Sequence, residues 1–229
     1  MFSDITIVIP TKNEESCIKS TILEIKKLGF KKIIVADANS TDQTVKIAKN
    51  LNCFCFYQKK DGYGQAVTES LSYIKTRYVS FVDADGSYNP RSLLKMYKLI
   101  KKKKLDSVLA SRYKNGLRSD DDTLIRFIGN MIFTKMLRLL FRINITDFLF
   151  HYMLCDLKKY KNLNLKYNSF SLCFEVPIRM KNKNYKFLEI KSKERKRTSG
   201  VSKVNAFKDG LIMLKDVILL FYELKIKIR

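Results

Sequence analysis

Tyr78-Val79-Ser80-Phe81-Val82-Asp83-Ala84-Asp85-Gly86 places two carboxylates at the end of a short apolar run. Its first five residues include β-branched and aromatic side chains and predict a buried strand. Gly86 permits a sharp turn directly afterwards. Carboxylate oxygens suit Mg²⁺ or Mn²⁺, and a Mg²⁺ site usually combines one or two carboxylates with substrate phosphates. Asp83 and Asp85 are therefore a candidate metal site, and the plain alternative is a solvated acidic turn.

Apolar runs and helical patterns alternate on both sides of this stretch. The expected strands are 5–9, 33–36, 53–57, 78–82 and 107–111. Apolar residues at helical spacing predict a first helix that Asn13 would cap and Gly29 would end. Further helices would begin near Ser40, after the glycine loop at 61–64 and after Pro90. Strands alternating with helices predict an α/β fold with a mostly parallel sheet covered on both faces.

Polar residues follow several of these strands. Asp37 closes the second strand, the loop at 61–64 follows the third, and Asp83 and Asp85 follow the fourth. In such folds, ligands bind beyond the carboxyl ends of the strands. The topology therefore predicts that these three elements converge on one rim of the sheet.

Composition limits the class of protein and of partner. A chain of 229 residues suits one domain, and an apolar content of 46% is enough for a sizeable core. The net charge of +23, from 45 Lys and Arg against 22 Asp and Glu, indicates an anionic partner. Nucleic acid, an anionic membrane surface and phosphorylated substrates all fit this charge.

The five cysteines include no Cys-x-x-Cys pair, and His151 is the single histidine, which argues against a zinc site. The odd cysteine count suits a reducing compartment. Because Asp4 interrupts the short apolar start, no signal peptide is expected. No apolar stretch reaches the roughly 18–20 residues that span a bilayer.

The C-terminal part changes character. Residues 124–143 and 205–224 predict two amphipathic helices, and the tail at 225–229 is basic. Apolar groups beside lysines are typical of a helix that lies on an anionic membrane surface. The alternative is an ordinary helix that packs on the domain with a basic end. We expect one domain with a C-terminal extension.

Several short motifs occur in order along nearly the whole chain. They are Ile7-Val8-Ile9-Pro10-Thr11-Lys12-Asn13-Glu14-Glu15, Asp37-Ala38-Asn39-Ser40-Thr41-Asp42, Gly62-Tyr63-Gly64-Gln65-Ala66, Asp83-Ala84-Asp85-Gly86, Ser111-Arg112-Tyr113, Arg126, Glu175-Val176-Pro177 and Arg197-Thr198-Ser199-Gly200-Val201-Ser202-Lys203. In this order the chain resembles the family 2 glycosyltransferases of the GT-A fold. More narrowly, it is similar to the dolichol-phosphate mannose synthase and polyprenyl-phosphate hexose synthase group. The resemblance implies a Rossmann-like three-layer sandwich with C-terminal amphipathic helices, in which residues 1–115 bind the nucleotide sugar and 116–229 bind the acceptor.

The resemblance also implies residue roles. The nucleotide-sugar-binding residues would be Pro10, Thr11, Glu14, Asp37, Gly64, Asp83 and Ala84. The metal ligands would be Asp83 and Asp85. The acceptor-phosphate-binding residues would be Arg112, Arg126, Arg197, Ser202 and Lys203, since arginine binds phosphate oxygens in a bidentate way. The catalytic set would be Asp85, Arg112, Arg126, Asp147 and Glu175.

The implied reaction is an inverting transfer of a hexose from a GDP- or UDP-linked donor to a polyprenyl (dolichyl or undecaprenyl) phosphate at the cytoplasmic membrane face. Mg²⁺ or Mn²⁺ and basic residues would neutralise the leaving diphosphate. A lipid phosphate is already an anion and needs little help from a base. A hydroxyl acceptor would need a carboxylate such as Asp147 or Glu175 within hydrogen-bond reach. The alternative for both carboxylates is a helix cap or a buried ion pair.

The chain departs from the group at two places. Bulky residues occupy 148–152, where members of the lipid-phosphate group usually carry a small Ser-Gly pair. Ser87 stands where mannose synthases often have a glutamine that helps the metal. His151 lies beside the expected acceptor site, and a lone histidine among aromatic residues is more typical of packing than of catalysis.

The sequence leaves three other functions open. The first keeps the glycosyltransferase activity and has a glycan hydroxyl in cell-surface polysaccharide synthesis as the acceptor. A basic nucleic-acid-binding module would fit the charge, but no nucleic-acid motif occurs, and without a metal the acidic pair would repel phosphate. A sugar nucleotidyltransferase would carry a glycine-rich loop with a basic residue after its first strand, where this chain has Thr11-Lys12-Asn13-Glu14.

Overall fold

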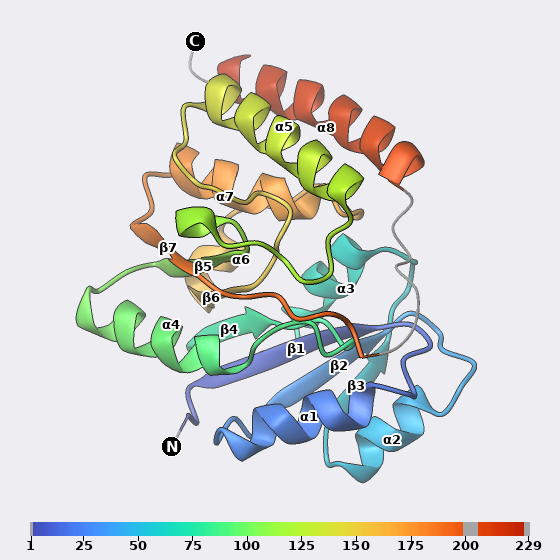
Figure 1. Cartoon of the computed structure of the whole chain (residues 1–229). Helices are drawn as coiled ribbons and strands as arrows, with labels where there is room; N and C mark the ends of the chain where they lie inside the picture. The colour runs from blue at the N-terminus through green and yellow to red at the C-terminus, as the bar shows by residue number, and fades with distance from the viewer. Residues whose placement is uncertain (1, 199–205, 227–229) are drawn as a thin grey trace.

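The computed structural model describes residues 2–198 and 206–226, and within them the chain forms a seven-stranded sheet in the order β3-β2-β1-β4-β6-β5-β7 (Figure 1). The strands are β1 Ile5–Thr11, β2 Ile33–Asp37, β3 Phe54–Tyr57, β4 Tyr78–Phe81, β5 Ser107–Ser111, β6 Met153–Asp156 and β7 Phe187–Lys191. The five strands expected from the sequence are all present, with ends that differ by up to two residues.

The sheet is parallel except for β6, which confirms the mostly parallel α/β fold. β6 lies antiparallel between β4 and β5, so that Cys155 is opposite both Val79 and Ser107. β7 then pairs parallel with β5 at the edge. Neither β6 nor β7 is among the strands expected from the sequence. β6 is only four residues long, and β7 alternates without a strong apolar face, so neither carries a clear local signal.

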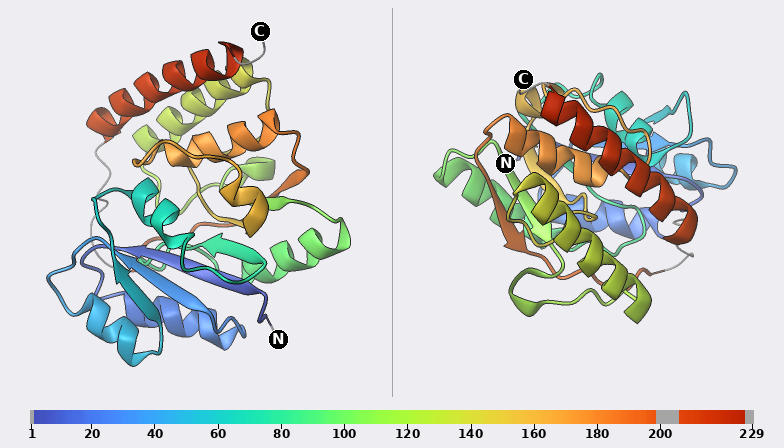
Figure 2. Two further views of the ribbon diagram at one scale, coloured as in Figure 1. Left: turned by 180° about the vertical axis from the view of Figure 1, so that it is seen from behind. Right: turned by 90° about the horizontal axis from the view of Figure 1, so that it is seen from above.

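Helices cover both faces of the sheet (Figures 1 and 2). They are α1 Ile18–Lys27, α2 Thr44–Asn50, α3 Tyr63–Ser70, α4 Arg91–Lys102, α5 Leu124–Phe141, α6 Leu157–Lys161, α7 Leu172–Asn182 and α8 Ala206–Ile226, with a 3-10 turn at Lys114–Gly116. On one face, Ile22 of α1 and Met96 of α4 belong to the same core cluster as Ile7 of β1. On the other face, Val67 of α3 and Phe174 of α7 share a core cluster with β-strand residues.

α5 and α8 lie side by side as an outer layer over α7 (Figures 1 and 2). Phe133 of α5 packs against Phe174 of α7, with ring centroids 5.7 Å apart. Leu137 and Leu220 are fully buried on the inner faces of the two outer helices. The two helices expected in this region are therefore present and amphipathic. In the parts of the chain that the structure describes, no helix is long and apolar enough to cross a membrane.

The start of the first helix differs from the expectation. α1 begins at Ile18, and Asn13 lies in the preceding loop with a φ of 52°, so it is not the helix cap. Its Oδ1 instead accepts a hydrogen bond from the Thr41 backbone N–H at 2.9 Å, and its own N–H donates to Ser40 Oγ at 2.8 Å. The loops after β1 and β2 therefore brace each other. This contact joins residues 27 or 28 positions apart, and a local pattern cannot reveal it.

Candidate active site

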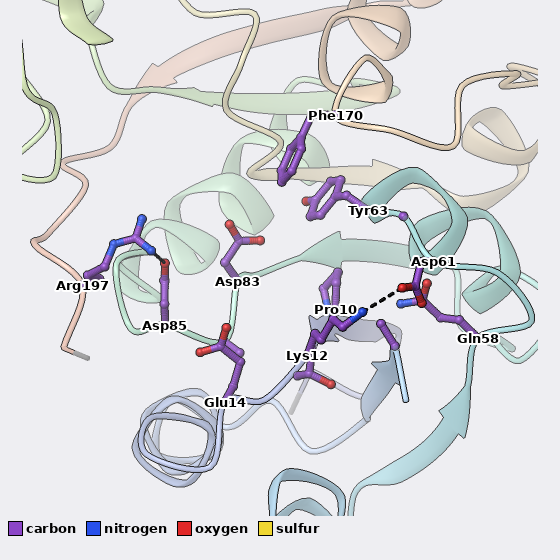
Figure 3. Close-up of a pocket in the computed structure, with 14 residues that line it drawn as sticks. Pro10, Lys12, Glu14, Gln58, Asp61, Tyr63, Asp83, Asp85, Phe170 and Arg197 are labelled. Atoms are coloured by element: carbon purple, nitrogen blue, oxygen red, sulfur yellow. Dashed lines mark hydrogen bonds and ion pairs between the residues drawn. The ribbon is translucent and has the colours of Figure 1, made fainter. Parts of the chain in front are cut away.

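A pocket of about 330 Å³ opens beyond the carboxyl ends of β1 to β4 (Figure 3). Its lining comes from the ends of those strands and from two later segments. The lining residues are Pro10, Thr11, Lys12, Glu14, Ala38, Gln58, Asp61, Gly62, Tyr63, Asp83, Ala84, Asp85, Phe170 and Arg197. The structure thus brings the loop after β3 and the acidic pair after β4 to one rim, as the topology predicts.

Asp85 lies at one side of the pocket, facing Arg197. Asp85 Oδ1 accepts a hydrogen bond from the Ser87 N–H at 3.0 Å, which fixes the turn, and Oδ2 lies 3.7 Å from Arg197 Nη1. The Asp85 carbonyl accepts two further bonds, from the Thr198 N–H and hydroxyl, each at 3.0 Å. The segment that follows β7 is therefore attached directly to the acidic turn, although more than a hundred residues separate them.

Arg197 is held mainly by Asp121. Its Nε and Nη2 reach Asp121 Oδ2 at 3.1 and 2.7 Å. These bonds raise the pKa of Arg197 above its ordinary value. Burial works to raise the pKa of Asp121, but the bonds from Arg197 outweigh it and leave that pKa below the usual range. Both groups are consequently charged at neutral pH, and the guanidinium is aimed at the pocket.

Asp83 lies deeper, on the other side of Asp85. Burial, together with the nearby charges of Asp85 and Glu194, raises the pKa of its carboxyl to about 8. Among the ion pairs of the described residues, none involves Asp83. Two carboxylates crowded together with little positive charge beside the inner one provide a favourable place for a cation.

The acidic pair fits a divalent cation as part of its ligand set. The described residues hold no group of three or more His, Cys, Asp or Glu side chains arranged to bind a metal. Mg²⁺ in nucleotide sites is usually held by one or two carboxylates together with substrate phosphates and water. Asp83 and Asp85 match that pattern, because the remaining ligands would come from the donor.

Five of the residues expected to bind the nucleotide sugar line the pocket, namely Pro10, Thr11, Glu14, Asp83 and Ala84. Asp37 does not. It is fully buried behind the wall, and its carboxylate accepts hydrogen bonds from the Thr11 hydroxyl at 3.0 Å and from the Ser40 N–H at 2.7 Å. The structure thus places Asp37 as the support of Thr11, one layer behind the position that the resemblance implies.

Gly64 is also placed behind the pocket wall. A Cβ at Gly64 would lie 2.3 Å from the Tyr167 carbonyl oxygen, and one at Gly62 would lie 2.3 Å from that of Asn168. Nearby, the Gln65 N–H donates to the Asn168 carbonyl at 3.2 Å. The two glycines therefore let the loop before α7 press onto the start of α3, which brings Phe170 to the pocket beside Tyr63.

Arg112 and Asp147 form a buried bidentate pair outside the pocket lining. Arg112 Nε and Nη2 lie 2.8 and 2.9 Å from the two Asp147 oxygens, and Arg112 Nη1 lies 3.5 Å from Glu194. Burial disfavours the charge, but Asp147 and Glu194 keep the pKa of Arg112 well above its ordinary value. Asp147 is therefore part of a buried ion pair, which is one of the alternatives to a catalytic base that the sequence leaves open.

Glu175 likewise has a structural role. It is fully buried on α7, where it accepts hydrogen bonds from the Lys166 and Tyr167 N–H groups and from Arg179 Nε at 2.7 Å. Arg179 in turn binds Glu223 of α8. The Glu175 side chain ties α7 to the loop before it and, through Arg179, to α8, and the structure does not bring it to the pocket.

The remaining expected residues are more distant or outside the described chain. Arg126 lies on the first turn of α5, outside the pocket lining, and its charge helps to lower the pKa of Asp121. Ser202 and Lys203 lie outside the described residues.

Sequence reasoning missed several residues of the site. Asp61 and Tyr63 lie in the expected glycine loop at 61–64, but the sequence predicts no role for either. Asp121 and Glu194 are the carboxylate partners of the expected arginines. The need of those arginines for an acidic partner is the signal that could have pointed to both residues. Phe170 has no local signal, because only the close packing on α3 brings it to the pocket.

Comparisons with known proteins show the family of this chain. A family model described as "Glycosyl transferase family 2" matches residues 6–163. The glycosyltransferase AglJ of Haloferax volcanii is 26% identical over 175 residues, which cover 76% of this chain and 57% of that protein. A dolichyl-phosphate hexose transferase of the same organism is 25% identical over 231 residues, covering 99% of this chain and 98% of that protein. This chain thus spans little more than half of AglJ and nearly all of the hexose transferase.

Solved structures share the fold. Glucosyl-3-phosphoglycerate synthase from Mycobacterium tuberculosis, crystallised with Mn²⁺, UDP and glucosyl-3-phosphoglycerate, superposes with a TM-score of 0.73. The match covers 96% of this chain and 79% of that chain at 17% identity. At this identity the likeness concerns the fold, and it agrees with the layered α/β arrangement described above.

Proposed function

Because the chain belongs to glycosyl transferase family 2 and has the GT-A fold, we propose that it transfers a hexose, with inversion, from a nucleotide-diphosphate sugar to a polyprenyl phosphate. The observation that carries this proposal is the pocket at the carboxyl ends of β1 to β4, where Asp83, Asp85 and Arg197 face one another. An acidic pair beside an arginine is the combination that a metal-bound diphosphate requires.

The donor half of the proposed reaction uses residues 1–115. Asp85, assisted by Asp83, would hold Mg²⁺ or Mn²⁺, which supplies charge neutralisation for the leaving diphosphate. Pro10, Thr11 and Glu14 would border the nucleoside, with the backbone of Ala84 alongside. Arg197, already charged and aimed at the pocket by Asp121, would bind phosphate oxygens without rearranging.

The acceptor half, residues 116–229, is proposed to bind a lipid phosphate. Two relatives with such names support this acceptor, the hexose transferase above and a UDP-N-acetylglucosamine–dolichyl-phosphate N-acetylglucosaminyltransferase of Methanococcus voltae. The structure adds a physical reason. Asp147 and Glu175, the expected bases for a hydroxyl acceptor, are both occupied by arginines. An acceptor that is already anionic needs neither of them. Arg112, Arg126, Ser202 and Lys203 are proposed to contribute positive charge to that phosphate.

An anionic membrane surface is the proposed location of the acceptor, at its cytoplasmic face. The outer faces of α5 and α8 together expose many large apolar side chains. These residues, here called the outer apolar face, are Leu124, Ile125, Ile128, Ile132, Leu139, Leu140, Leu211, Ile212, Leu214, Ile218, Leu219 and Tyr222. The exposed cations Lys135, Arg138 and Lys215 lie on the same helices. Apolar residues interspersed with lysines and arginines suit the interface of an anionic bilayer.

The test is a transfer assay with purified protein, several labelled GDP- and UDP-sugars, Mn²⁺, and either polyprenyl phosphate in vesicles or free sugar acceptors. We expect product on the lipid phosphate, and we expect Asp85→Asn to lower the rate by about 10²–10³-fold while leaving the melting temperature near that of the wild type. Asp4→Asn, at the opposite end of β1, is the matched control and should keep the rate. Transfer only to the sugar acceptor would favour polysaccharide synthesis, and full activity of Asp85→Asn would reject the metal role.

A further inference from the structure

His151 is a buried titratable residue to which the proposed reaction gives no role. Only 3% of its surface is exposed, and its imidazole is hydrogen bonded at both nitrogens. Nδ1 lies 3.1 Å from Tyr63 Oη, and Nε2 lies 3.0 Å from Tyr160 Oη. Tyr160 is fully buried in the core, whereas Tyr63 lines the pocket. The three side chains form one row that leads from the core to the pocket wall.

Burial keeps the His151 of this row neutral. Burial lowers the pKa of His151 to about 3, so at ordinary pH the ring carries one N–H and one lone pair. Each tyrosine hydroxyl can donate one hydrogen. One tyrosine therefore donates to the imidazole while the other accepts from it. Phe81 stacks on the imidazole with ring centroids 4.6 Å apart, which restricts rotation of the ring.

At the pocket end, Tyr63 is half of an aromatic pair. Its ring stacks on Phe170 with centroids 5.1 Å apart and an interplanar angle of 12°. Figure 3 shows the two rings together on the wall beside Asp83. The close packing at Gly62 and Gly64 joins their two segments, as described above. The pair is thus fixed at its backbone by glycine contacts, and at its hydroxyl by His151.

Tyr88 connects this wall to the acidic pair. Tyr88 is buried close to both, and the charges of Asp83 and Tyr63 add to the effect of burial in raising its pKa well above the ordinary value. Burial and the charge of Asp83 raise the pKa of Tyr63 well above its ordinary value, so its hydroxyl stays protonated. The hydroxyl of Tyr63 is engaged by His151. The ring, rather than a free hydroxyl, is what Tyr63 offers to a ligand.

We propose that His151 is a positioning residue, which holds Tyr63, and with it the stacked Tyr63–Phe170 pair, as the wall against which a ring of the bound nucleotide sugar packs. This inference rests on the proposed function. A rigid aromatic pair offers a large apolar contact area with little loss of conformational freedom on binding. Without the bond to His151, the Tyr63 ring would lose its fixed orientation and the wall would have to be ordered by the donor at a cost in affinity.

Three single substitutions test the row. His151→Phe removes both hydrogen bonds and keeps an aromatic ring, and Tyr63→Phe removes only the pocket-side bond and keeps the stack. Tyr160→Phe is the matched control, because it removes a buried bond of the same kind at the end that does not touch the pocket. Donor binding is measured by calorimetric titration of UDP and of UDP-sugar in the presence of Mn²⁺, and KM, kcat and melting temperature are recorded alongside.

We expect His151→Phe and Tyr63→Phe each to raise the donor Kd and KM by about 3- to 10-fold, the range of one hydrogen bond, with little change in kcat. The double variant should add little, because both changes break the same row. Tyr160→Phe should lower the melting temperature and raise the donor Kd less than Tyr63→Phe does, because it leaves the pocket-side bond in place. If only UDP-sugar binding weakens, the hexose packs on the wall; if UDP binding weakens equally, the nucleoside does.

A folded His151→Phe protein that binds donor as tightly as the wild type would make His151 a core residue and overturn the inference. If that variant does not fold, Tyr63→Phe decides, since it removes a single hydroxyl and keeps the ring. A wild-type protein that binds neither UDP nor GDP with Mn²⁺ would instead refute the proposed function, so the two failures are distinguishable.

Discussion

Arg197 and Asp121 form a forked pair, in which Nε and Nη2 of the arginine converge on Asp121 Oδ2 at 3.1 and 2.7 Å. The pair lies next to the acidic turn, with Arg197 Nη1 only 3.7 Å from Asp85. Asp121 thus fixes the position of a cation that would otherwise be free to pair with Asp85 alone. A metal ion that binds Asp85 would meet an arginine already held by another acid.

Asp121→Asn should therefore impair donor binding. The amide leaves Arg197 without its main anionic partner, so the guanidinium shifts toward Asp85 and competes with the metal. We expect a rise in the donor KM and in the Kd for Mn²⁺ of about tenfold, which corresponds to about 1.4 kcal/mol. Electron paramagnetic resonance of Mn²⁺ and steady-state kinetics measure the two quantities. Asp120→Asn is the control, because Asp120 pairs with Lys193 on the surface and should change neither.

The buried Arg112–Asp147 pair should act on stability. Asp147→Asn removes the charge that compensates Arg112, and breaking a buried pair costs about 3–5 kcal/mol. Denaturant unfolding measures this loss, and Asp120→Asn again supplies the surface comparison, with an expected change below about 0.5 kcal/mol. An Asp147→Asn protein of unchanged stability but greatly reduced kcat would instead revive the general-base role.

His151 should make stability depend on pH. Its pKa is about 3 in the folded protein and about 6.5 when exposed, so between these values the unfolded state binds more protons than the native state. Stability is therefore fully present above pH 6.5 and is lost as the pH falls toward 3, by at most about 1.4 kcal/mol per pH unit from this residue. Unfolding of wild-type and His151→Phe proteins from pH 7 to 4 should give a difference that narrows or reverses on acidification. A difference that is constant with pH would contradict the burial of a neutral imidazole.

Gly64 should not tolerate a side chain. A Cβ there would be 2.3 Å from the Tyr167 carbonyl oxygen, so Gly64→Ala must push the loop away from α3, at a cost of about 1–3 kcal/mol. Gly129→Ala is the matched control, because nothing lies within 4 Å of the added Cβ on α5. That change should stabilise the protein by about 0.5–1 kcal/mol. Thermal unfolding compares the two, and equal effects would show that the loop does not press on α3.

The outer apolar face should bind vesicles. Ile125 and Ile132 are 81% and 66% exposed on α5, and replacing both by glutamate adds negative charge as well as removing apolar surface. We expect sedimentation with anionic vesicles to fall by about tenfold or more. Leu23→Glu on α1 changes a leucine that is 45% exposed on the opposite side of the sheet and should have no effect. If neither wild-type nor variant protein sediments with anionic vesicles, the proposed membrane contact is wrong.

The sequence by itself determined the parts of this protein that depend on local pattern. Apolar runs and helical spacing fixed β1 to β5 and the helices between them, because burial of one face imposes a period on neighbouring residues. The rule that ligands bind beyond parallel strand ends then placed Asp83 and Asp85 at a pocket. The ordered motifs gave the family, and the comparisons agree.

Only the tertiary structure decided which polar groups are free to act. Asp147 pairs with Arg112 from 35 positions away, Asp121 with Arg197 from 76, and Tyr63 with His151 from 88. Whether a carboxylate serves as a base or neutralises an arginine depends on such distant partners, and they leave no periodic trace in the chain. The antiparallel strand β6 could not be predicted for the same reason. A strand of four residues is recognised only through its pairing with the two strands that it joins.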